Sequence, residues 1–154
     1  MHGGVGAAAV RVGRRGSLGV LLVVNAFGGI RDPSTGLWVA GARDAQGRVA
    51  PPTARSYRSG ALATTLGLVA TDLKVERPAL ARIVAMAHAG LASVIVPFHS
   101  PTDGDVLFGA ATGTARTASR EPEPGATADR LGFLASELAV RAALGAVRVA
   151  NAER

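Results

Sequence analysis

The pattern of apolar and polar positions along the chain predicts four strands. Residues 20–24 are apolar without interruption, which is typical of a buried strand, so we expect a strand over residues 17–25. Turn-forming residues follow it, including the run Asp32-Pro33-Ser34-Thr35-Gly36. An apolar segment at 37–42 predicts a returning strand that forms a hairpin with the first. Further strands are expected at residues 64–72 and 105–112.

Two segments have the spacing of helices. In residues 76–94, one buried stripe is predicted from positions at helical intervals, namely Leu80, Ile83, Val84, Ala87 and Leu91. Pro78 falls in the first turn, where the missing N–H costs nothing. Residues 128–149 predict a helix that is apolar on more than one side, as expected for burial between layers or against another chain. Together with antiparallel strands, these helices indicate an α+β layered domain, with a core thin enough to need a partner surface.

The segments between these elements are rich in glycine, proline or arginine. Gly4-x-Gly6-x-x-Ala9 imitates a dinucleotide-binding fingerprint, but the strand that such a fingerprint requires does not precede it. Residues 43–62 and 116–127 hold several prolines and few apolar residues, so we expect long connections without structure of their own. Connections of this length often have a functional reason.

Composition and charge narrow the class of protein. Of the 154 residues 48% are apolar and only 4% aromatic, so Ala, Val and Leu must fill the core. The absence of cysteine excludes disulfides and thiolate metal sites. No secretion signal opens the chain and no apolar run is long enough to span a bilayer, so we expect a cytoplasmic protein outside the membrane. The net charge of +6 comes from scattered arginines without a nucleic-acid motif, so a nucleic-acid-binding module rests on charge alone.

Two places in the sequence carry candidate chemistry. In Asp103-Gly104-Asp105, two carboxylates flank a glycine, although most such tripeptides are ordinary turns. His88 and His99 could join them as metal ligands, but the spacing typical of metal sites is missing, so we expect no metal and a structural role for His88. Thr64 lies where a long connection enters a strand, and by periodicity alone it is a β-branched strand residue. These residues alone do not name a reaction.

Longer motifs are more specific when taken together, and they cover most of the chain in order. They are Gly16-x-x-Gly19-Val20, Val24-Asn25-Ala26-x-Gly28, Asp32-Pro33-x-Thr35-Gly36, Ala40-Gly41-Ala42-Arg43, the run 64–72, the run 86–92, Pro97-x-His99-x-Pro101-x-Asp103-Gly104-Asp105-x-x-Phe108 and Ala111-Thr112-Gly113. In these motifs the chain resembles one family of self-processing N-terminal-nucleophile hydrolases. The family contains the L-aminopeptidase/D-esterases, the β-peptidyl aminopeptidases and the 6-aminohexanoate-oligomer endohydrolases.

The resemblance implies a fold and a division of the chain. The fold would be α+β and part of an αββα sandwich of the DmpA-like type, truncated at the N-terminus, because the family's remaining part precedes Met1. Family precursors cut themselves at a loop-to-strand junction, and the matching bond here joins Ala63 to Thr64. One partial hydrolase domain, 1–154, would then divide into residues 1–63, the end of the large-subunit part with the processing loop, and a small-subunit part, 64–154.

The resemblance also assigns roles to residues. Thr64 would be the nucleophile, with its freed α-amino group as the base, because an α-amine titrates near neutrality. Asp103 and Asp105 match the acidic pair of the threonine-type members and would orient the hydroxyl and the amine of Thr64. Asn25 matches the asparagine whose amide donates to the oxyanion. No cofactor and no metal are implied.

Substrate and partners follow only in general terms. A threonine with two aspartates resembles the oligomer-hydrolase branch, and the substrate would be a peptide or an amino-acid amide. The partner would be further copies of the chain or a complementary N-terminal half, which in some members supplies a lysine or tyrosine to the site. Position 63 is alanine where threonine-type relatives usually carry asparagine. The alternative is therefore an uncleaved, non-catalytic remnant or assembly subunit of the same fold.

Overall fold

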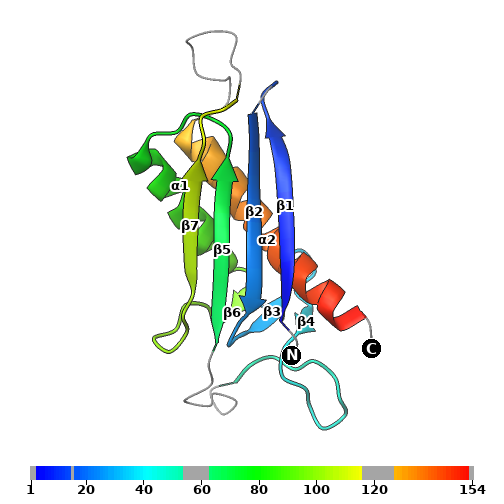
Figure 1. Cartoon of the computed structure of the whole chain (residues 1–154). Helices are drawn as coiled ribbons and strands as arrows, with labels where there is room; N and C mark the ends of the chain where they lie inside the picture. Colours follow the sequence, from blue (N-terminus) through cyan, green and yellow to red (C-terminus); the bar gives the residue numbers. More distant parts are fainter. Residues whose placement is uncertain (1–2, 15, 54–62, 116–126, 153–154) are drawn as a thin grey trace.

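A four-stranded sheet covered on one face by two helices dominates the computed structural model, which describes residues 3–14, 16–53, 63–115 and 127–152 (Figure 1). The sheet has the order β1-β2-β5-β7 and contains β1 (Gly4–Val12), β2 (Gly16–Asn25), β5 (Thr64–Thr71) and β7 (Val106–Ala111). Three short strands form a second sheet of order β4-β3-β6, with β3 (Gly29–Arg31), β4 (Trp38–Ala40) and β6 (Ile95–Val96). The helices are α1 (Arg77–Leu91) and α2 (Ala128–Ala152).

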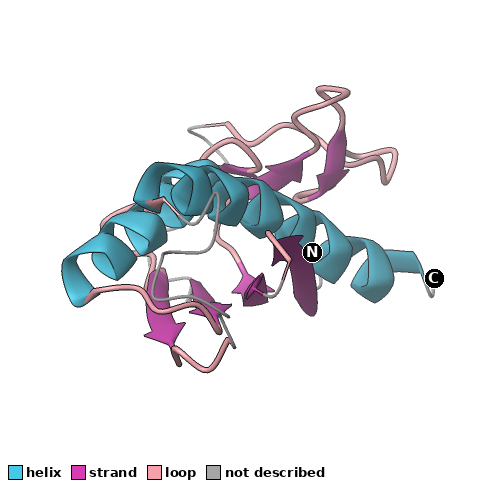
Figure 2. Ribbon diagram, turned by 90° about the horizontal axis from the view of Figure 1, so that it is seen from above, coloured by secondary structure: helices cyan, strands magenta, loops and turns pink. Residues whose placement is uncertain are grey.

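The helices lie side by side on one face of the four-stranded sheet (Figure 2). Alternation along the strands explains which side chains they cover, because successive residues of a strand point to opposite faces. In β2, the residues from Leu18 to Val24 alternate between buried and more exposed positions. From α1, the predicted stripe supplies Ile83, Ala87 and Leu91 to the core. Neither described helix has the length and apolar character that a membrane crossing needs.

The glycine-rich start of the chain is the first strand of the sheet, which the sequence pattern missed. Gly4 and Gly6 lie on β1 against α2. A Cβ atom on Gly6 would collide with the backbone oxygen of Ala142, and one on Gly4 with that of Ala146. These glycines therefore allow the helix to approach the strand closely, and no dinucleotide-binding turn is present there.

Pairing between the strands differs from the prediction in two ways. The strand at 17–25 forms no hairpin with 37–42, because β2 pairs with β1 and β5 while β4 pairs with β3 in the second sheet. The glycines and the turn at 28–36 carry the chain out of the first sheet. Moreover, β5 and β7 are parallel, because α1 lies between them in the sequence and returns the chain to the same end of the sheet. The predicted strands at 64–72 and 105–112 and both predicted helices are confirmed, as is the α+β class.

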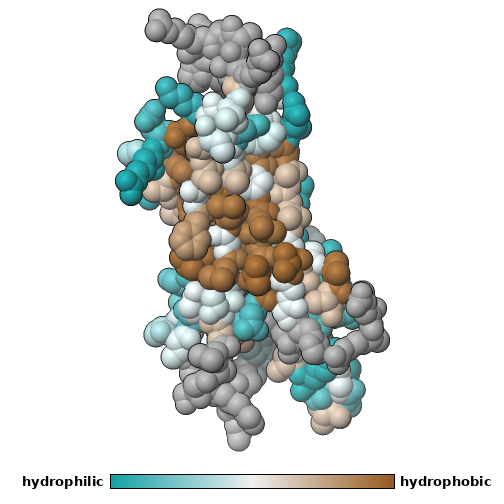
Figure 3. Space-filling model, in the orientation of Figure 1, coloured by the Kyte–Doolittle hydropathy of each residue, from teal (hydrophilic) through white to brown (hydrophobic). Residues whose placement is uncertain are grey.

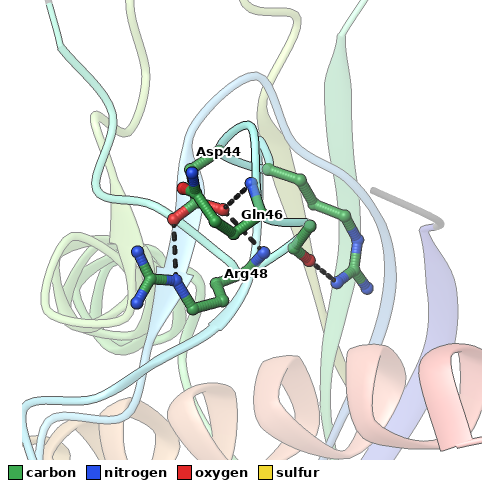
Figure 4. Close-up of polar contacts among 5 residues, drawn as sticks. Asp44, Gln46 and Arg48 are labelled. Atoms are coloured by element: carbon green, nitrogen blue, oxygen red, sulfur yellow. Dashed lines mark hydrogen bonds and ion pairs between the residues drawn. The ribbon is translucent and has the colours of Figure 1, made fainter.

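The first part of the long connection 43–62 has a structure of its own, contrary to the prediction. Asp44 closes a turn by accepting hydrogen bonds from the backbone N–H groups of Gln46 (3.0 Å) and Arg48 (2.8 Å), as Figure 4 shows. The Nε atom of Arg48 adds an ion pair to the other carboxylate oxygen at 2.9 Å. Residues 54–62, and most of the second connection at 116–127, lie outside the described residues.

The face of the four-stranded sheet that the helices leave uncovered is apolar. In register across the strands lie a row of Val5, Val23, Leu66 and Val106 and a row of Ala7, Leu21, Leu68 and Phe108. The large side chains of both rows are exposed, and Figure 3 shows them as a band across the sheet. A contiguous apolar surface of this kind marks an interaction surface. We call it the outer apolar face.

Candidate active site

The bond between Ala63 and Thr64 lies where the chain enters β5. Thr64 is the first residue of that strand and is half-buried. Its hydroxyl donates a hydrogen bond of 2.6 Å to the carbonyl oxygen of Ala63. The same oxygen accepts a 3.0 Å hydrogen bond from the backbone N–H of Gly104. The carbonyl group of the predicted cleavage site is therefore held by two donors, one of which is the predicted nucleophile.

Gly104 makes this close approach possible. A Cβ atom at this position would lie 2.8 Å from the hydroxyl oxygen of Thr64 and 3.6 Å from the carbonyl oxygen of Ala63. The former distance is shorter than real side chains adopt. Position 104 therefore needs glycine because a side chain would not fit between the two aspartates. Its backbone conformation does not require glycine, since Gly104 does not have a positive φ.

Asp105 joins the nucleophile strand to the preceding loop. The carboxylate is buried, and one oxygen accepts the backbone N–H of Thr65 at 2.6 Å. The other oxygen accepts the backbone N–H of His99 at 3.0 Å. Hydrogen bonds to a charged acceptor are stronger than neutral ones. Asp105 therefore fixes the residue next to Thr64 against the loop that carries the acidic pair, and its observed partners are backbone groups and not the Thr64 side chain.

Asp103 is buried without such partners. Its relative exposure is 8%, and neither carboxylate oxygen makes a hydrogen bond of good geometry within the described residues. Burial, and then the charge and a long side-chain contact of the neighbouring Asp105 carboxyl, raise the pKa of Asp103 to about 6, while a weak backbone hydrogen bond from Phe27 and the charge of His99 lower it in part. A bridge to Ala63 places Asp103 beside the predicted cleavage site. A carboxyl group with a pKa near the working pH is suited to proton transfer.

Asn25 lies on the strand next to Thr64. The two residues face each other in the β2–β5 register, so their side chains leave the sheet on the same side. Asn25 is exposed and Thr64 half-buried, and both continue the alternation of the outer apolar face by one further row. The candidate site therefore lies at one end of that face.

Two histidines contact each other close to the acidic pair. The rings of His88 on α1 and His99 are 4.5 Å apart in an edge-to-face arrangement, and Phe98 contacts His88 at 4.8 Å. Burial, and then the charge of His99, lowers the pKa of His88, whereas Asp105 raises it. Within the described ranges, no three His, Cys, Asp or Glu side chains are placed to hold a metal ion.

Comparison with known sequences identifies the family. The sequence model described as Peptidase family S58 matches residues 1–153. The chain belongs to peptidase family S58. An uncharacterized aminopeptidase of Mycobacterium tuberculosis is 34% identical over 165 residues, which cover 96% of this chain and 48% of the relative. One from Mycobacterium leprae is 32% identical over 166 residues, covering 98% of this chain and 46% of the relative. The S58 chain thus spans about half the length of the curated relatives it matches.

Solved structures support the fold. The L-aminopeptidase D-Ala-esterase/amidase of Ochrobactrum anthropi, described as a variant of the Ntn hydrolase fold, aligns with a TM-score of 0.62 at 18% identity. This match covers 93% of the S58 chain and 39% of the other chain. A β-aminopeptidase of Burkholderia sp. aligns with a TM-score of 0.58 at 20% identity, over 93% of the S58 chain and 41% of the other. At these identities the likeness shows the fold alone, and it agrees with part of the expected sandwich.

The structure brings the predicted site residues together at one end of the sheet. Thr64, Asp103 and Asp105 are linked through Ala63, Thr65 and Gly104, and Asn25 lies on the adjoining strand. Sequence reasoning missed the backbone N–H of Gly104 as a donor, because a backbone group has no residue-type signal. It also left the histidine pair aside, although both residues lie within the quoted motifs.

Proposed function

We propose that this chain carries the self-cleavage site and the nucleophile of an amide-bond hydrolase. The observation that carries the proposal is the contact between the Thr64 hydroxyl and the carbonyl group of Ala63, with Gly104 donating to the same oxygen. This contact holds the Thr64 hydroxyl beside the carbonyl group that it would attack. Membership of peptidase family S58 supports the reaction class.

In the proposed self-cleavage, the Thr64 oxygen attacks the carbonyl carbon of Ala63. Negative charge develops on the carbonyl oxygen, where the Gly104 N–H stabilises it. Asp103 accepts the hydroxyl proton and passes it to the leaving nitrogen of Thr64, which suits a pKa near 6. The C–N bond breaks and an ester joins the two residues. Water then hydrolyses this ester, leaving a carboxylate on Ala63 and a free α-amine on Thr64.

The freed amine changes the role of the site from self-cleavage to substrate hydrolysis. The α-amino group of Thr64 takes the proton of its own hydroxyl, which attacks the substrate amide. The buried oxygens of Asp103, which make no hydrogen bond of good geometry within the described residues of the uncleaved chain, would accept hydrogen bonds from the resulting ammonium group. Asn25 would donate its amide to the substrate oxyanion from the neighbouring strand. The substrate would be a peptide or an amino-acid amide.

The proposed enzyme needs a second layer over the outer apolar face. The row formed by Asn25 and Thr64 continues the exposed apolar rows, so whatever covers those rows also covers the site. The relatives contain roughly as much chain again as this one, and we propose that a complementary N-terminal half supplies this layer, with assembly into homo-oligomers as a further step. Cleavage would divide the chain into residues 1–63 and 64–154.

Amide hydrolysis by the purified protein tests the proposal. Release of amine from amino-acid p-nitroanilides and 6-aminohexanoate oligomers would be compared between the parent, Thr64→Ser and Thr64→Ala, with and without the N-terminal half of a relative. We expect the parent and Thr64→Ser to hydrolyse the substrates, whereas Thr64→Ala should not. Equal background rates in all three, with a folded complex, would instead indicate the non-catalytic assembly subunit.

A further inference from the structure

His88 and His99 form a contact between helix α1 and the loop that carries the acidic pair. Their rings are perpendicular at a centroid distance of 4.5 Å, and the ring of Phe98 lies 4.8 Å from His88 and 6.0 Å from His99. Edge-to-face ring pairs at such distances contribute beyond simple burial. His88 is half-buried and His99 is exposed, so one ring is fixed in the helix and the other rests on it.

The backbone of His99 is equally constrained. Among the described residues other than glycine, only His99 has a positive φ, at 56°. Non-glycine residues adopt this conformation at a cost and persist in it where surrounding contacts hold them. Here the conformation directs the backbone N–H of His99 onto Asp105. The ring contact with α1 and the hydrogen bond to the acidic pair thus act on one residue.

The charge of His99 acts on the groups around it. Within the part of the chain that the structure describes, the titratable groups with which it interacts are His88 on α1 and Asp103 and Asp105 in the loop before β7. A positive charge on His99 lowers the pKa of Asp103 and also lowers the pKa of His88. The acidic pair is therefore electrostatically coupled to a histidine pair that the proposed reaction does not use.

We propose that His99, supported by His88, is a positioning residue that fixes the orientation of Asp105 and so the geometry of the acidic pair beside the nucleophile. The ring contact holds the strained backbone, the backbone holds Asp105, and Asp105 holds Thr65 beside the nucleophile. The imidazolium form of His99 favours the ionised form of Asp103. The consequence for self-cleavage rests on the proposed function, whereas the coupling between His99 and Asp103 does not.

Titration of the carboxyl carbons by ¹³C NMR tests the coupling in the full chain carrying Thr64→Ala, which cannot cleave. Asp103 is assigned by the signal lost in Asp103→Asn. His99→Asn removes the ring while asparagine tolerates the positive φ. The Asp103 midpoint, about 6 in the parent, should rise by roughly 0.5 pH unit, a modest change because solvent screens an exposed charge. The His88 ring midpoint, followed by proton NMR, should rise too.

Two further variants keep the test decisive. Arg82→Gln removes a positive charge from the exposed surface of the same helix, and both midpoints should stay unchanged. His88→Gln removes the ring that supports His99, so the Asp103 midpoint should rise by a smaller amount. Unfolding would instead move that midpoint down towards 3.8, so a rise cannot come from loss of structure. If His99→Asn unfolds, the result with His88→Gln decides.

The rate of self-cleavage, measured in chains that keep Thr64, supplies the functional measurement. His99→Asn should slow cleavage about twofold at pH 6, where Asp103 is only partly ionised, and by less at pH 8. An Asp103 midpoint that moves in neither His99→Asn nor His88→Gln, together with a His88 midpoint unchanged in His99→Asn, would overturn the positioning role. Coupled midpoints in a chain that never cleaves would leave the coupling standing and remove the proposed function instead.

Discussion

Two buried aspartates, Asp32 and Asp103, differ in their hydrogen-bond partners and in the direction of their pKa shifts. Asp32 is 6% exposed and accepts hydrogen bonds from the backbone N–H of Ser34 (2.9 Å), the Ser34 hydroxyl (2.6 Å) and Arg148 (2.6 Å). The Ser34 hydrogen bonds, with Arg148 adding to them, lower the pKa of Asp32. Asp103 is 8% exposed, makes no hydrogen bond of good geometry within the described residues, and has a raised pKa.

The difference separates a carboxylate that stabilises the fold from one that the proposed reaction would use. Asp32 closes the turn between β3 and β4 and joins it to the C-terminal part of α2 through Arg148. Its negative charge is satisfied, so it contributes to the stability of the fold. The charge of Asp103 is poorly satisfied in the uncleaved chain. The fold is therefore less stable when Asp103 is ionised than when it is protonated. Unsatisfied buried groups of this kind are typical of functional sites.

The largest effect should come from Asp103→Asn on self-cleavage. Asparagine has a similar shape but cannot accept the hydroxyl proton, so cleavage should slow by about a hundredfold or more. The fraction of cleaved chain against time, followed by mass spectrometry, measures the rate. Asp32→Ala serves as the comparison and should cleave at the parent rate wherever it is folded. A parent-like rate in Asp103→Asn would show that Asp103 is not the base.

Stability should respond in the reverse order. Asp32→Ala in the uncleavable Thr64→Ala chain removes the acceptor of the Ser34 and Arg148 hydrogen bonds, so Tm should fall by several degrees. Asp103→Asn in the same background should leave Tm at pH 7 unchanged or higher, because it removes an unsatisfied buried charge. Thermal unfolding followed by circular dichroism makes the comparison. A large loss of Tm in Asp103→Asn would mean that its carboxylate has a stabilising partner.

The two aspartates should also give stability opposite dependences on pH. The folded-state pKa of Asp103, about 6, is above its ordinary value of 3.8, so its contribution is favourable at low pH and is lost as the pH rises through 6. Since one pKa unit corresponds to about 1.4 kcal/mol, the free energy of unfolding should differ on the order of 2 kcal/mol between pH 4 and pH 7.5 from this group. The pKa of Asp32 is lowered, so its contribution is lost only at acid pH, below 3.8.

Urea unfolding of the Thr64→Ala chain, with and without Asp103→Asn, isolates this contribution. His88 has a lowered pKa, and its contribution weakens as the pH falls through its unfolded value of about 6.5, which opposes Asp103 over part of the range. The difference between the two chains removes the His88 contribution. An identical pH dependence in both chains would contradict the raised pKa of Asp103.

The smallest effect is expected from Arg148→Met. The Arg148 side chain is 59% exposed, and ion pairs of exposed side chains contribute little. Methionine keeps part of the apolar contact of the side chain, so Tm should fall less than in Asp32→Ala. The loss of Tm caused by Arg148→Met should be smaller still in 0.5 M salt, because salt screens an exposed ion pair. Equal losses of Tm in Arg148→Met and Asp32→Ala would place the stabilisation in the ion pair and not in the turn.

The sequence predicted those parts of the fold in which one pattern dominates. Both helices and the strands β2, β5 and β7 follow from their periodicity and apolar runs. The strand β1 was missed because its glycines and alanines serve close packing on α2 and imitate a loop. Strand pairing was predicted wrongly because it depends on where the chain leaves the sheet, and local pattern does not encode that.

For the candidate site, residue types were easier to predict than contacts. The resemblance pointed to Thr64, Asp103, Asp105 and Asn25, and the structure places them around one junction. It did not reveal that Asp105 accepts two well-formed backbone hydrogen bonds while Asp103 accepts none of good geometry. Hydrogen-bond partners arise from the packing of distant segments, so the difference between the two aspartates required the structure.

The intact mass of freshly purified protein tests the central claim most directly. Self-cleavage predicts two pieces whose masses correspond to residues 1–63 and 64–154, with Thr64 as the new N-terminus, and a single chain in Thr64→Ala. Because the outer apolar face is exposed, the measurement would be made both alone and after mixing with the N-terminal half of a relative. One unbroken chain of 15.5 kDa under both conditions would contradict the account.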